Sequence, residues 1–267
     1  MTADHTGRPP PGPAADAVPA VRVAHLYPDR MNIYADRGNL AVLRRRLAWR
    51  GLTLEVADVG LGDRVDPDAC DLVYLGGGQD RDQELVAQDL VATKADALRA
   101  ATADGAVLLA VCGGYQLAGA GYTGVDGSRM PGIDVLDVDT EAGPTRLIGD
   151  VVIEAEIDGV TRQVVGYENH AGRTTLGPGS TPLGRVVHGH GNDGSGGFEG
   201  AVTGRAIGTY LHGPLLPKNP WLADLVLRWA LERGTGESIT LEPLDDTLEQ
   251  RAHAAAVARA HPRHADR

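Results

Sequence analysis

The segment Ala106–Leu117 (AVLLAVCGGYQL) constrains the fold most strongly, because an apolar run ends abruptly at a cysteine and two glycines. Residues 106–111 suit a short buried strand, and a helix can begin near Tyr115. The glycines permit a sharp turn between the two elements. A strand that turns sharply into a helix is typical of a nucleophile elbow, which exposes the residue at its apex above the sheet. The segment therefore predicts a catalytic role for Cys112.

A structural role for Cys112 is the alternative, because free cysteine is among the most buried residue types. The glycine pair favours the nucleophile, and the N-terminus of the following helix would favour a thiolate. The chain has one other cysteine, Cys70, which precedes a predicted strand and is expected to be structural. If Cys112 is the nucleophile, the rest of the chain must supply a base and an oxyanion site.

Composition excludes several other classes of protein. The chain has 267 residues, of which 42% are hydrophobic, enough for one large domain. A net charge of −11 argues against a nucleic-acid binder. Two cysteines give neither a disulfide framework nor a zinc signature, so no metal is expected. No apolar run reaches membrane-span length, and the first residues lack the apolar stretch of a signal peptide. A cytoplasmic protein without membrane insertion is expected.

Strands and helices alternate through the first half of the chain. This pattern predicts an α/β fold with a mostly parallel central sheet flanked by helices. The expected elements are strands at 21–27, 52–56 and 71–75, helices at 34–50 and 82–103, antiparallel strands at 147–153 and 163–167, a strand at 205–211 and a helix at 221–233. The run Arg44–Arg46 is expected on a solvated helix face.

Three segments describe the expected domain organisation. Residues 1–19 are rich in Pro, Ala and Asp, which predicts a disordered N-terminal tail. Residues 20–240 are expected to form one domain, since no linker or internal repeat interrupts them. Residues 241–267 are expected to be a C-terminal tail that is partly helical or disordered.

Three consecutive glycines, Gly76–Gly78, follow the predicted strand at 71–75. Open α/β sheets bind ligands at the carboxyl ends of their strands. Successive glycines also let backbone N–H groups point at an anion. Beside a nucleophile elbow, this segment is expected to supply one oxyanion donor near Gly78, with the amide of Gly113 as the other.

A histidine at the end of a later predicted strand is the best candidate for the base. His212 would face the same edge of the sheet as Cys112, where it could take and return a proton. His170 is the competitor, because it also follows a predicted strand and Glu168 could orient it. The pairing with Cys112 favours His212.

Three blocks, VCGGYQ at 111–116, GYENH at 166–170 and GTYLHG at 208–213, occur in this order. They resemble the class I glutamine amidotransferases, and within that class the cobyric-acid-synthase-like branch. Within the branch, the chain is most similar to the glutaminase subunits of lipid II isoglutaminyl synthase. That similarity also rests on LYPD at 26–29, NIY at 32–34, Gly38-Asn39, GGGQD at 76–80 and TRLIGD at 145–150, and it spans about 21–235.

The resemblance implies a class I glutamine amidotransferase fold and hydrolysis of L-glutamine. Cys112 would attack the side-chain amide and His212 would act as general base and acid. Arg146 matches the family arginine linked to glutamine, and its guanidinium suits the α-carboxylate through paired hydrogen bonds. The substrate-binding set would thus be Arg146, Gly78, Gly113 and Gln116.

One position departs from the wider class. Many class I enzymes carry a glutamate two residues after the catalytic histidine, and here that position is Pro214. The cobyric-acid-like branch shares this difference, so the resemblance implies a Cys112–His212 dyad. The sequence leaves open which group orients the imidazole.

The chain contains no Gly-x-x-x-x-Gly-Lys-[Ser/Thr] loop, so no cofactor is expected in it. The resemblance implies a heterodimer with a MurT-like Mur ligase subunit that carries ATP and Mg²⁺. That partner would use the ammonia to amidate the D-glutamate α-carboxylate of the lipid II stem peptide to D-isoglutamine, a step of peptidoglycan biosynthesis.

Three alternatives remain open. The first is a cobyrinate or cobyric-acid-type amidotransferase subunit. The second is a stand-alone Cys-dependent γ-glutamyl hydrolase, which would need no partner. The third is a regulatory binding module with an inactive amidotransferase fold, against which the presence of both Cys112 and His212 argues.

Overall fold

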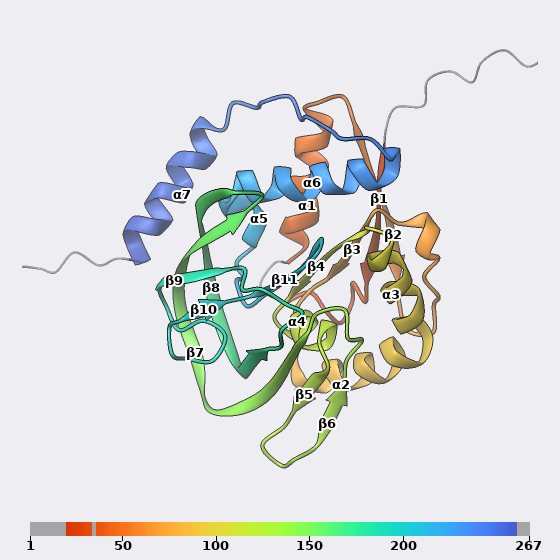
Figure 1. Ribbon diagram of the computed structural model, residues 1–267, viewed down its shortest axis with the longest axis vertical. Coiled ribbons are helices and arrows are strands. Elements are labelled where there is room, and N and C mark those ends of the chain that lie inside the picture. The colour runs from red at the N-terminus through yellow and green to blue at the C-terminus, as the bar shows by residue number, and fades with distance from the viewer. Residues whose placement is uncertain (1–19, 34–35, 261–267) are drawn as a thin grey trace, which may run out of the picture.

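The cysteine segment lies near the middle of a six-stranded sheet (Figure 1). The structure is a computed structural model that describes residues 20–33 and 36–260, so the predicted tail at 1–19 lies outside the described residues. The strand order is β11-β12-β4-β3-β1-β2, and all neighbours are parallel except β11 and β12. The strands are β1 Ala20–Leu26, β2 Thr53–Val59, β3 Leu72–Leu75, β4 Val107–Val111, β11 Ala201–Thr203 and β12 Ala206–Thr209. The predicted mostly parallel sheet is confirmed.

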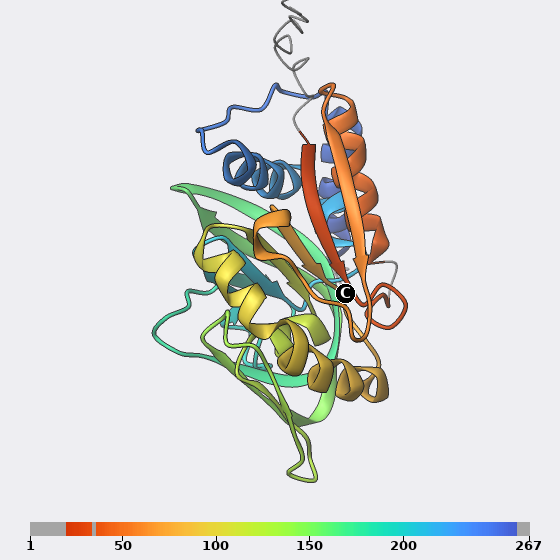
Figure 2. The same ribbon diagram turned by 90° about the vertical axis from the view of Figure 1, so that its right-hand side faces the viewer.

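Helices connect these strands and pack on them (Figures 1 and 2). The helix α1 packs on β2, α6 packs on β1 and β4, and the two helices contact each other. The helices are α1 Arg37–Ala48, α2 Asp80–Asp89, α3 Ala95–Ala103, α4 Gly113–Ala118, α5 Leu215–Lys218, α6 Pro220–Thr235 and α7 Thr247–Ala260, with a short 3₁₀ turn at Pro67–Ala69. The helix predicted at 82–103 is interrupted by a π-helical turn at Leu90–Lys94. The helix after the cysteine begins at Gly113, two residues earlier than expected.

A second, mostly antiparallel sheet is larger than the sequence indicated. Its order is β10-β9-β7-β5-β6, with β8 paired to β7. Its strands are β5 Gly121–Thr123, β6 Arg129–Pro131, β7 Val138–Ile157, β8 Val160–Leu176, β9 Gly184–His188 and β10 Phe198–Glu199. The two strands predicted at 147–153 and 163–167 are therefore parts of one long hairpin, which curves around the molecule in Figure 1.

The turn of this hairpin explains why the two strands pair over such a length. Asp158 and Gly159 connect them, and both have positive φ, 55° and 73°. Two residues with positive φ make the turn whose twist matches a β-hairpin, and Asp-Gly is a preferred pair for it. The irregular register between Ala142 and Leu147 then bends the pair, because unequal numbers of residues oppose each other there.

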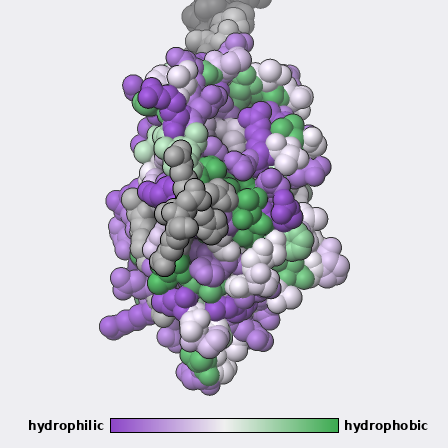
Figure 3. Space-filling model, turned by 90° about the vertical axis from the view of Figure 1, so that its left-hand side faces the viewer, coloured by the Kyte–Doolittle hydropathy of each residue, from purple (hydrophilic) through white to green (hydrophobic). Residues whose placement is uncertain are grey.

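The C-terminal segment is an ordered helix where the structure describes it. The helix α7 buries Ala260 against Val152 and Val165 of the long hairpin. The guanidinium of Arg259 donates two hydrogen bonds, of 3.0 and 2.8 Å, to the carboxylate of Asp150. The face of the molecule on this side is mostly hydrophilic, with hydrophobic residues gathered near its middle (Figure 3). The helical part of the expected tail thus packs on the second sheet.

The arginine run on α1 also differs from the expectation. Arg44 and Arg45 are exposed, but Arg46 is fully buried. The guanidinium of Arg46 donates to both oxygens of Asp224 on α6 and both oxygens of Asp246, just before α7, at 2.6–2.9 Å. The prediction of a solvated face was wrong for this residue, because its two carboxylate partners are distant in sequence. In the described part of the chain, no helix combines the length and apolar character needed to cross a membrane.

Candidate active site

The strand β4 delivers Cys112 to the carboxyl end of the parallel sheet in a strained conformation. All five residues of β4 are buried, and the backbone N–H of Cys112 donates to Thr209 O at 2.8 Å. Cys112 has φ 52° and ψ −107°, a region that L-residues rarely adopt and that costs about 1–3 kcal/mol. A Cβ at Gly114 would lie 2.4 Å from Leu75 O, so only glycine permits this turn. The geometry is that of a nucleophile elbow.

Two backbone amides lie close together beside the cysteine. A Cβ at Gly113 would lie 3.3 Å from the nitrogen of Gly78, which places the two expected oxyanion donors next to each other. Gly113 is the first residue of α4, where an amide has no partner within its helix. The amide of Gly78 enters none of the backbone hydrogen bonds found among the described residues. Both N–H groups are thus available to a negatively charged oxygen.

His212 is held between the two sheets by backbone hydrogen bonds. Its N–H donates to Tyr167 O at 2.8 Å, and its carbonyl accepts from Tyr167 N–H at 3.2 Å. The strand β12 ends at Thr209, so His212 lies three residues beyond it rather than at its end. Its ring is fully buried and lies over the glycine segment, since a Cβ at Gly77 would be 3.1 Å from His212 Cε1. The GYENH and GTYLHG blocks therefore meet at the catalytic candidate.

The carboxylate of Asp36, which no sequence motif predicts, faces this imidazole. Asp36 Oδ1 lies 3.7 Å from His212 Nδ1, and both side chains are fully buried. Burial alone would lower the pKa of His212, but the neighbouring Cys112 sulfur and the Asp36 carboxylate outweigh it and raise this pKa to about 10. At neutral pH the ring is therefore an imidazolium beside Cys112.

No sequence signal separates Asp36 from an ordinary helix cap. It stands immediately before α1, and aspartate is a preferred residue at that position in any helix. Only the absence of an acid at Pro214 hinted that an acid from elsewhere orients His212.

Gln116 lies in a chain of buried polar side chains. Its Oε1 accepts from Gln83 Nε2 at 2.7 Å, and its Nε2 donates to the hydroxyl of Tyr210 at 3.2 Å. The same hydroxyl is 2.7 Å from Thr174 Oγ1. These contacts fix the orientation of the Gln116 amide. They do not test the expected role of Gln116 as a substrate ligand. Gln83, on α2, is a member of the site that the sequence did not single out.

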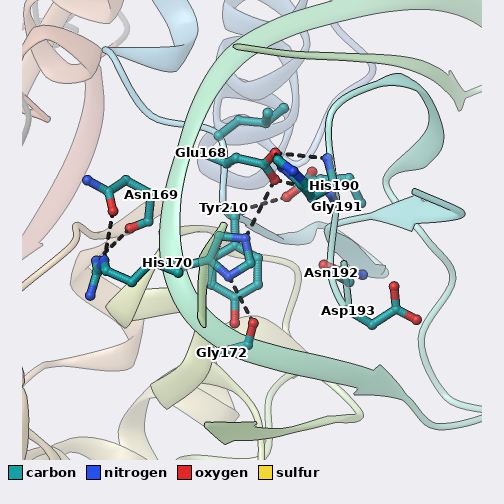
Figure 4. Close-up of polar contacts among 12 residues, drawn as sticks. Glu168, Asn169, His170, Gly172, His190, Gly191, Asn192, Asp193 and Tyr210 are labelled. Atoms are coloured by element: carbon teal, nitrogen blue, oxygen red, sulfur yellow. Dashed lines mark hydrogen bonds and ion pairs between the residues drawn. The ribbon is translucent and has the colours of Figure 1, made fainter. Parts of the chain in front are cut away.

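Arg146 lies on β7 within the irregular stretch of the hairpin. Its guanidinium donates to the side chain and the carbonyl of Asn169, at 2.9 and 3.0 Å, and remains exposed. Asn169 is labelled on the left of Figure 4, on the strand that carries the GYENH block. The described contacts do not join Arg146 to Cys112. Its role as the ligand of the substrate α-carboxylate stays a prediction.

His170, the competing base, joins the polar chain of Gln116 through Tyr210 (Figure 4). Its ring stacks on Tyr210 with a centroid distance of 3.5 Å, and its Nδ1 is 2.9 Å from Gly172 O. Burial lowers the pKa of His170 despite the carboxylate of Glu168, 3.6 Å from Nε2. Glu168 also binds the ring and backbone N–H of His190, at 2.6 and 2.8 Å. These contacts give His170 and Glu168 a role in packing β8 against the loop that contains His190 and Gly191.

The remaining expectations concern Cys70 and metals. Burial, together with Asp71, raises the pKa of Cys70 to about 11, which keeps it a thiol. Among the described residues, no group of three or more His, Cys, Asp or Glu side chains is arranged to hold a metal ion.

Sequence comparisons agree with this geometry. The family model for the CobB/CobQ-like glutamine amidotransferase domain matches residues 22–220. The GatD subunit of lipid II isoglutaminyl synthase (glutamine-hydrolyzing) from Staphylococcus aureus N315 is 38% identical over 240 residues, which are 89% of this chain and 95% of that protein. The Streptococcus pneumoniae R6 GatD subunit is 38% identical over 231 residues, 86% and 88% of the two chains. Cobyric acid synthase from Pelotomaculum thermopropionicum is 37% identical, but the match covers 43% of that protein.

Solved structures show the same fold. PurLQS from Thermotoga maritima superposes with a TM-score of 0.52 at 16% identity, covering 81% of this chain and 96% of that one. A glutamine amidotransferase structure gives a TM-score of 0.51 at 15% identity, covering 78% and 98%. The family model spans the elbow, the glycine segment and the histidine alike. The chain belongs to the CobB/CobQ-like glutamine amidotransferase family, in the branch that contains the GatD subunits of lipid II isoglutaminyl synthase.

Proposed function

We propose that this chain is the glutamine-hydrolysing subunit of a lipid II isoglutaminyl synthase. The observation that carries the proposal is the arrangement of Cys112, His212 and the paired amides of Gly78 and Gly113 at one edge of the sheet. The similarity to the GatD subunits over nearly their full length supports the same substrate.

The reaction follows from the chemistry of these groups. The sulfur of Cys112 attacks the side-chain amide carbon of glutamine, and the Gly78 and Gly113 N–H groups stabilise the oxyanion that forms. The His212 imidazolium gives its proton to the leaving nitrogen, which departs as ammonia and leaves a thioester. His212, now neutral, takes a proton from water as the water attacks the thioester. The products are glutamate and ammonia, and Cys112 is regenerated.

Two binding roles complete the proposal. Arg146 would bind the α-carboxylate of glutamine. Its guanidinium is exposed beside Asn169 of β8, the strand that carries the GYENH block, and a guanidinium suits a carboxylate. Gln116 would contact the substrate from the buried polar chain, in which Gln83 and Tyr210 hold its amide. This chain would need no cofactor of its own for hydrolysis.

The ammonia would serve a partner chain. Amidating a carboxylate requires its activation, and the sequence contains no P-loop for ATP. We infer a heterodimer with a MurT-like Mur ligase subunit, which binds ATP and Mg²⁺ and amidates the D-glutamate α-carboxylate of the lipid II stem peptide. A cobyric-acid-type role is less well supported, because the match covers less than half of the cobyric acid synthase relative.

The test is glutamate release from glutamine, with and without the ligase subunit and ATP. Cys112→Ala should abolish release, and the matched control Cys70→Ala should retain it, because Cys70 is a buried thiol outside the site. With the partner, amide formation on lipid II should require glutamine, ATP and an intact Cys112. Glutamate release by Cys112→Ala at the wild-type rate would contradict the mechanism. Release without any amide transfer would instead support the stand-alone hydrolase.

A further inference from the structure

Asp36 occupies a helix-cap position but does not cap its helix. Its side chain accepts no hydrogen bond from the first turn of α1. Instead, Oδ2 accepts from the backbone N–H of Gly77 at 2.8 Å, and Oδ1 faces His212 Nδ1 at 3.7 Å. The carboxylate is fully buried. Its two oxygens therefore point at two different parts of the active site.

The backbone around Asp36 fixes the direction of this carboxylate. Its N–H donates to Ile33 O at 3.2 Å, and its carbonyl accepts from the hydroxyl of Tyr74 at 3.0 Å and from Asn39 N–H at 2.9 Å. Tyr74 lies on the strand that leads into the glycine segment. Since Asp36 is tied at both its N–H and its C=O, its side chain is preorganised rather than free to turn away.

The loop after His212 is attached to the same turn of α1. Asn39 Oδ1 accepts from the backbone N–H of Leu216 at 2.8 Å. A Cβ at Gly38 would lie 2.6 Å from Pro214 Cγ, so the helix and the loop are in direct contact. Pro214 holds the position at which many class I enzymes carry the orienting glutamate. In this chain Pro214 packs against α1, which begins immediately after Asp36.

We propose that Asp36 is the positioning residue of this active site, holding the His212 ring through Nδ1 and the Gly77 amide through its other oxygen. The inference rests on the proposed glutaminase function and adds a third group to it. With Nδ1 turned to the carboxylate, Nε2 is the nitrogen that exchanges a proton with Cys112. Fixing the Gly77 amide also fixes the adjacent peptide, which carries the Gly78 oxyanion donor.

The separation of 3.7 Å is an ion-pair distance and is longer than a hydrogen bond. It is consistent with a positioning role, because catalytic hydrogen bonds often tighten only when substrate binds.

Other charged groups act on His212 as well. Cys112 faces it from the elbow, and Glu199 of β10 acts on it from the second sheet. The carboxyl of Glu199 is committed to other donors, the backbone N–H of Tyr210 at 2.6 Å and the hydroxyl of Thr209 at 2.9 Å. Burial raises the pKa of Glu199 to about 8, so it is mostly neutral at pH 7. Asp36 is thus the acid placed to hold an imidazolium.

The test compares Asp36→Asn with the matched control Glu199→Gln, in the full chain together with its ligase partner. Both changes replace a buried carboxyl near His212 by an amide of the same shape. Asp36→Asn should lower kcat for glutamine hydrolysis by about 10²-fold or more with little change in KM, as expected when a base loses its orienting charge. The alkaline limb of kcat/KM should move to lower pH by about one unit. Asp36→Glu should recover part of kcat, and Glu199→Gln should leave kcat at neutral pH unchanged, because Glu199 is mostly neutral there.

A second readout does not depend on glutamine as the substrate. Alkylation of Cys112 by iodoacetamide, followed by peptide mass mapping, reports how readily the cysteine and imidazole form an ion pair. The pH of half-maximal alkylation should rise by about one unit in Asp36→Asn and stay in place in Glu199→Gln.

Two results would overturn the inference. One is an Asp36→Asn protein, with wild-type thermal stability, that keeps both the wild-type kcat and the wild-type alkylation midpoint. The other is a shift of both readouts in Glu199→Gln instead. If wild-type protein releases no glutamate at all, the proposed function fails, yet the alkylation midpoints still decide the role of Asp36.

Discussion

At the scale of single residues, the backbone of Gly77 leaves little space beside the His212 imidazole. Gly77→Ala would place a Cβ 3.0 Å from Ile33 Cγ1 and 3.1 Å from His212 Cε1. The ring would have to shift by a few tenths of an ångström, so we expect kcat/KM to fall by about tenfold or more. The free energy of unfolding should change by less than about 1 kcal/mol. Steady-state kinetics and chemical denaturation measure the two effects.

The control for this prediction is Gly149→Ala on β7. A Cβ there meets no atom within 4 Å, so activity and stability should both match wild type. Wild-type kcat/KM in Gly77→Ala would show that the ring does not need its present position.

Arg146 is expected to bind the substrate without taking part in the reaction. Arg146→Lys keeps the charge but loses the planar pair of donors that suits a carboxylate. We expect KM for glutamine to rise by about tenfold or more while kcat changes little, because binding is lost without a change at the reacting atoms. Arg129→Lys, at an exposed ion pair on β6, is the control. A drop in kcat at unchanged KM would assign Arg146 a different role.

The sequence could predict where single residues lie when strand ends determine their position. Cys112 and Gly78 follow neighbouring parallel strands, so the topology alone brings them together. Asp36 could not be found in this way, because an aspartate before a helix has an ordinary explanation and its contact with His212 spans most of the chain.

At the scale of elements, Arg46 joins three segments that are far apart in the sequence. It links α1 to Asp224 on α6 and to Asp246 before α7, and its side chain is 1% exposed. Arg46→Met would leave two carboxylates without this partner, and breaking a buried ion pair costs about 3–5 kcal/mol. Because both carboxylates are partly exposed, we expect the free energy of unfolding to fall by about 2–3 kcal/mol. Urea denaturation measures this change.

Limited proteolysis supplies a second reading of the same variant. Cleavage between α6 and α7 should accelerate in Arg46→Met, because Asp246 holds that segment to the core. Arg44→Met is the control, since Arg44 is exposed on the same helix. Equal stability of the two variants would mean that the buried cluster does not hold the C-terminal segment in place.

The sequence predicted the parallel half of the fold better than the antiparallel half. Buried parallel strands such as β3 and β4 are continuous apolar runs that end at glycines, which makes them visible. The long hairpin carries mixed residues and an irregular register, so only its most apolar parts were predicted. The Asp158-Gly159 pair was an available signal for its turn.

For the whole molecule, buried acids set how stability varies with pH. Burial raises the pKa of Glu199 to about 8, against an ordinary value near 4.5, despite the hydrogen bonds from Tyr210 and Thr209. The folded state therefore binds this proton more tightly than the unfolded state. Its stabilising effect is fully present below about pH 4.5 and is lost as pH rises to about 8. His212, with its pKa raised to about 10, acts in the same direction between about pH 6.5 and 10.

Groups with lowered pKa values act in the opposite direction. Arg46 and Arg50 hold the pKa of Asp224 below its usual value against the effect of burial, so stability from that carboxylate is lost as pH falls. Wild-type stability should thus pass through a maximum in mildly acidic solution and decline as pH rises from about 5 to 10. Urea denaturation between about pH 2 and pH 10 measures both sides of the curve.

Glu199→Gln separates the contribution of Glu199 to the loss of stability at rising pH from the contribution of His212. Glutamine cannot titrate, so the decline between about pH 5 and 8 should become shallower by a few kcal/mol, since one pKa unit corresponds to about 1.36 kcal/mol. The decline between about pH 8 and 10 should remain, because His212 is unchanged. A variant whose stability follows the wild-type slope from pH 5 to 8 would show that Glu199 is already ionised in the folded protein. In that case a second carboxylate would act on His212 at neutral pH, and the charge that holds the imidazolium would be shared between Asp36 and Glu199.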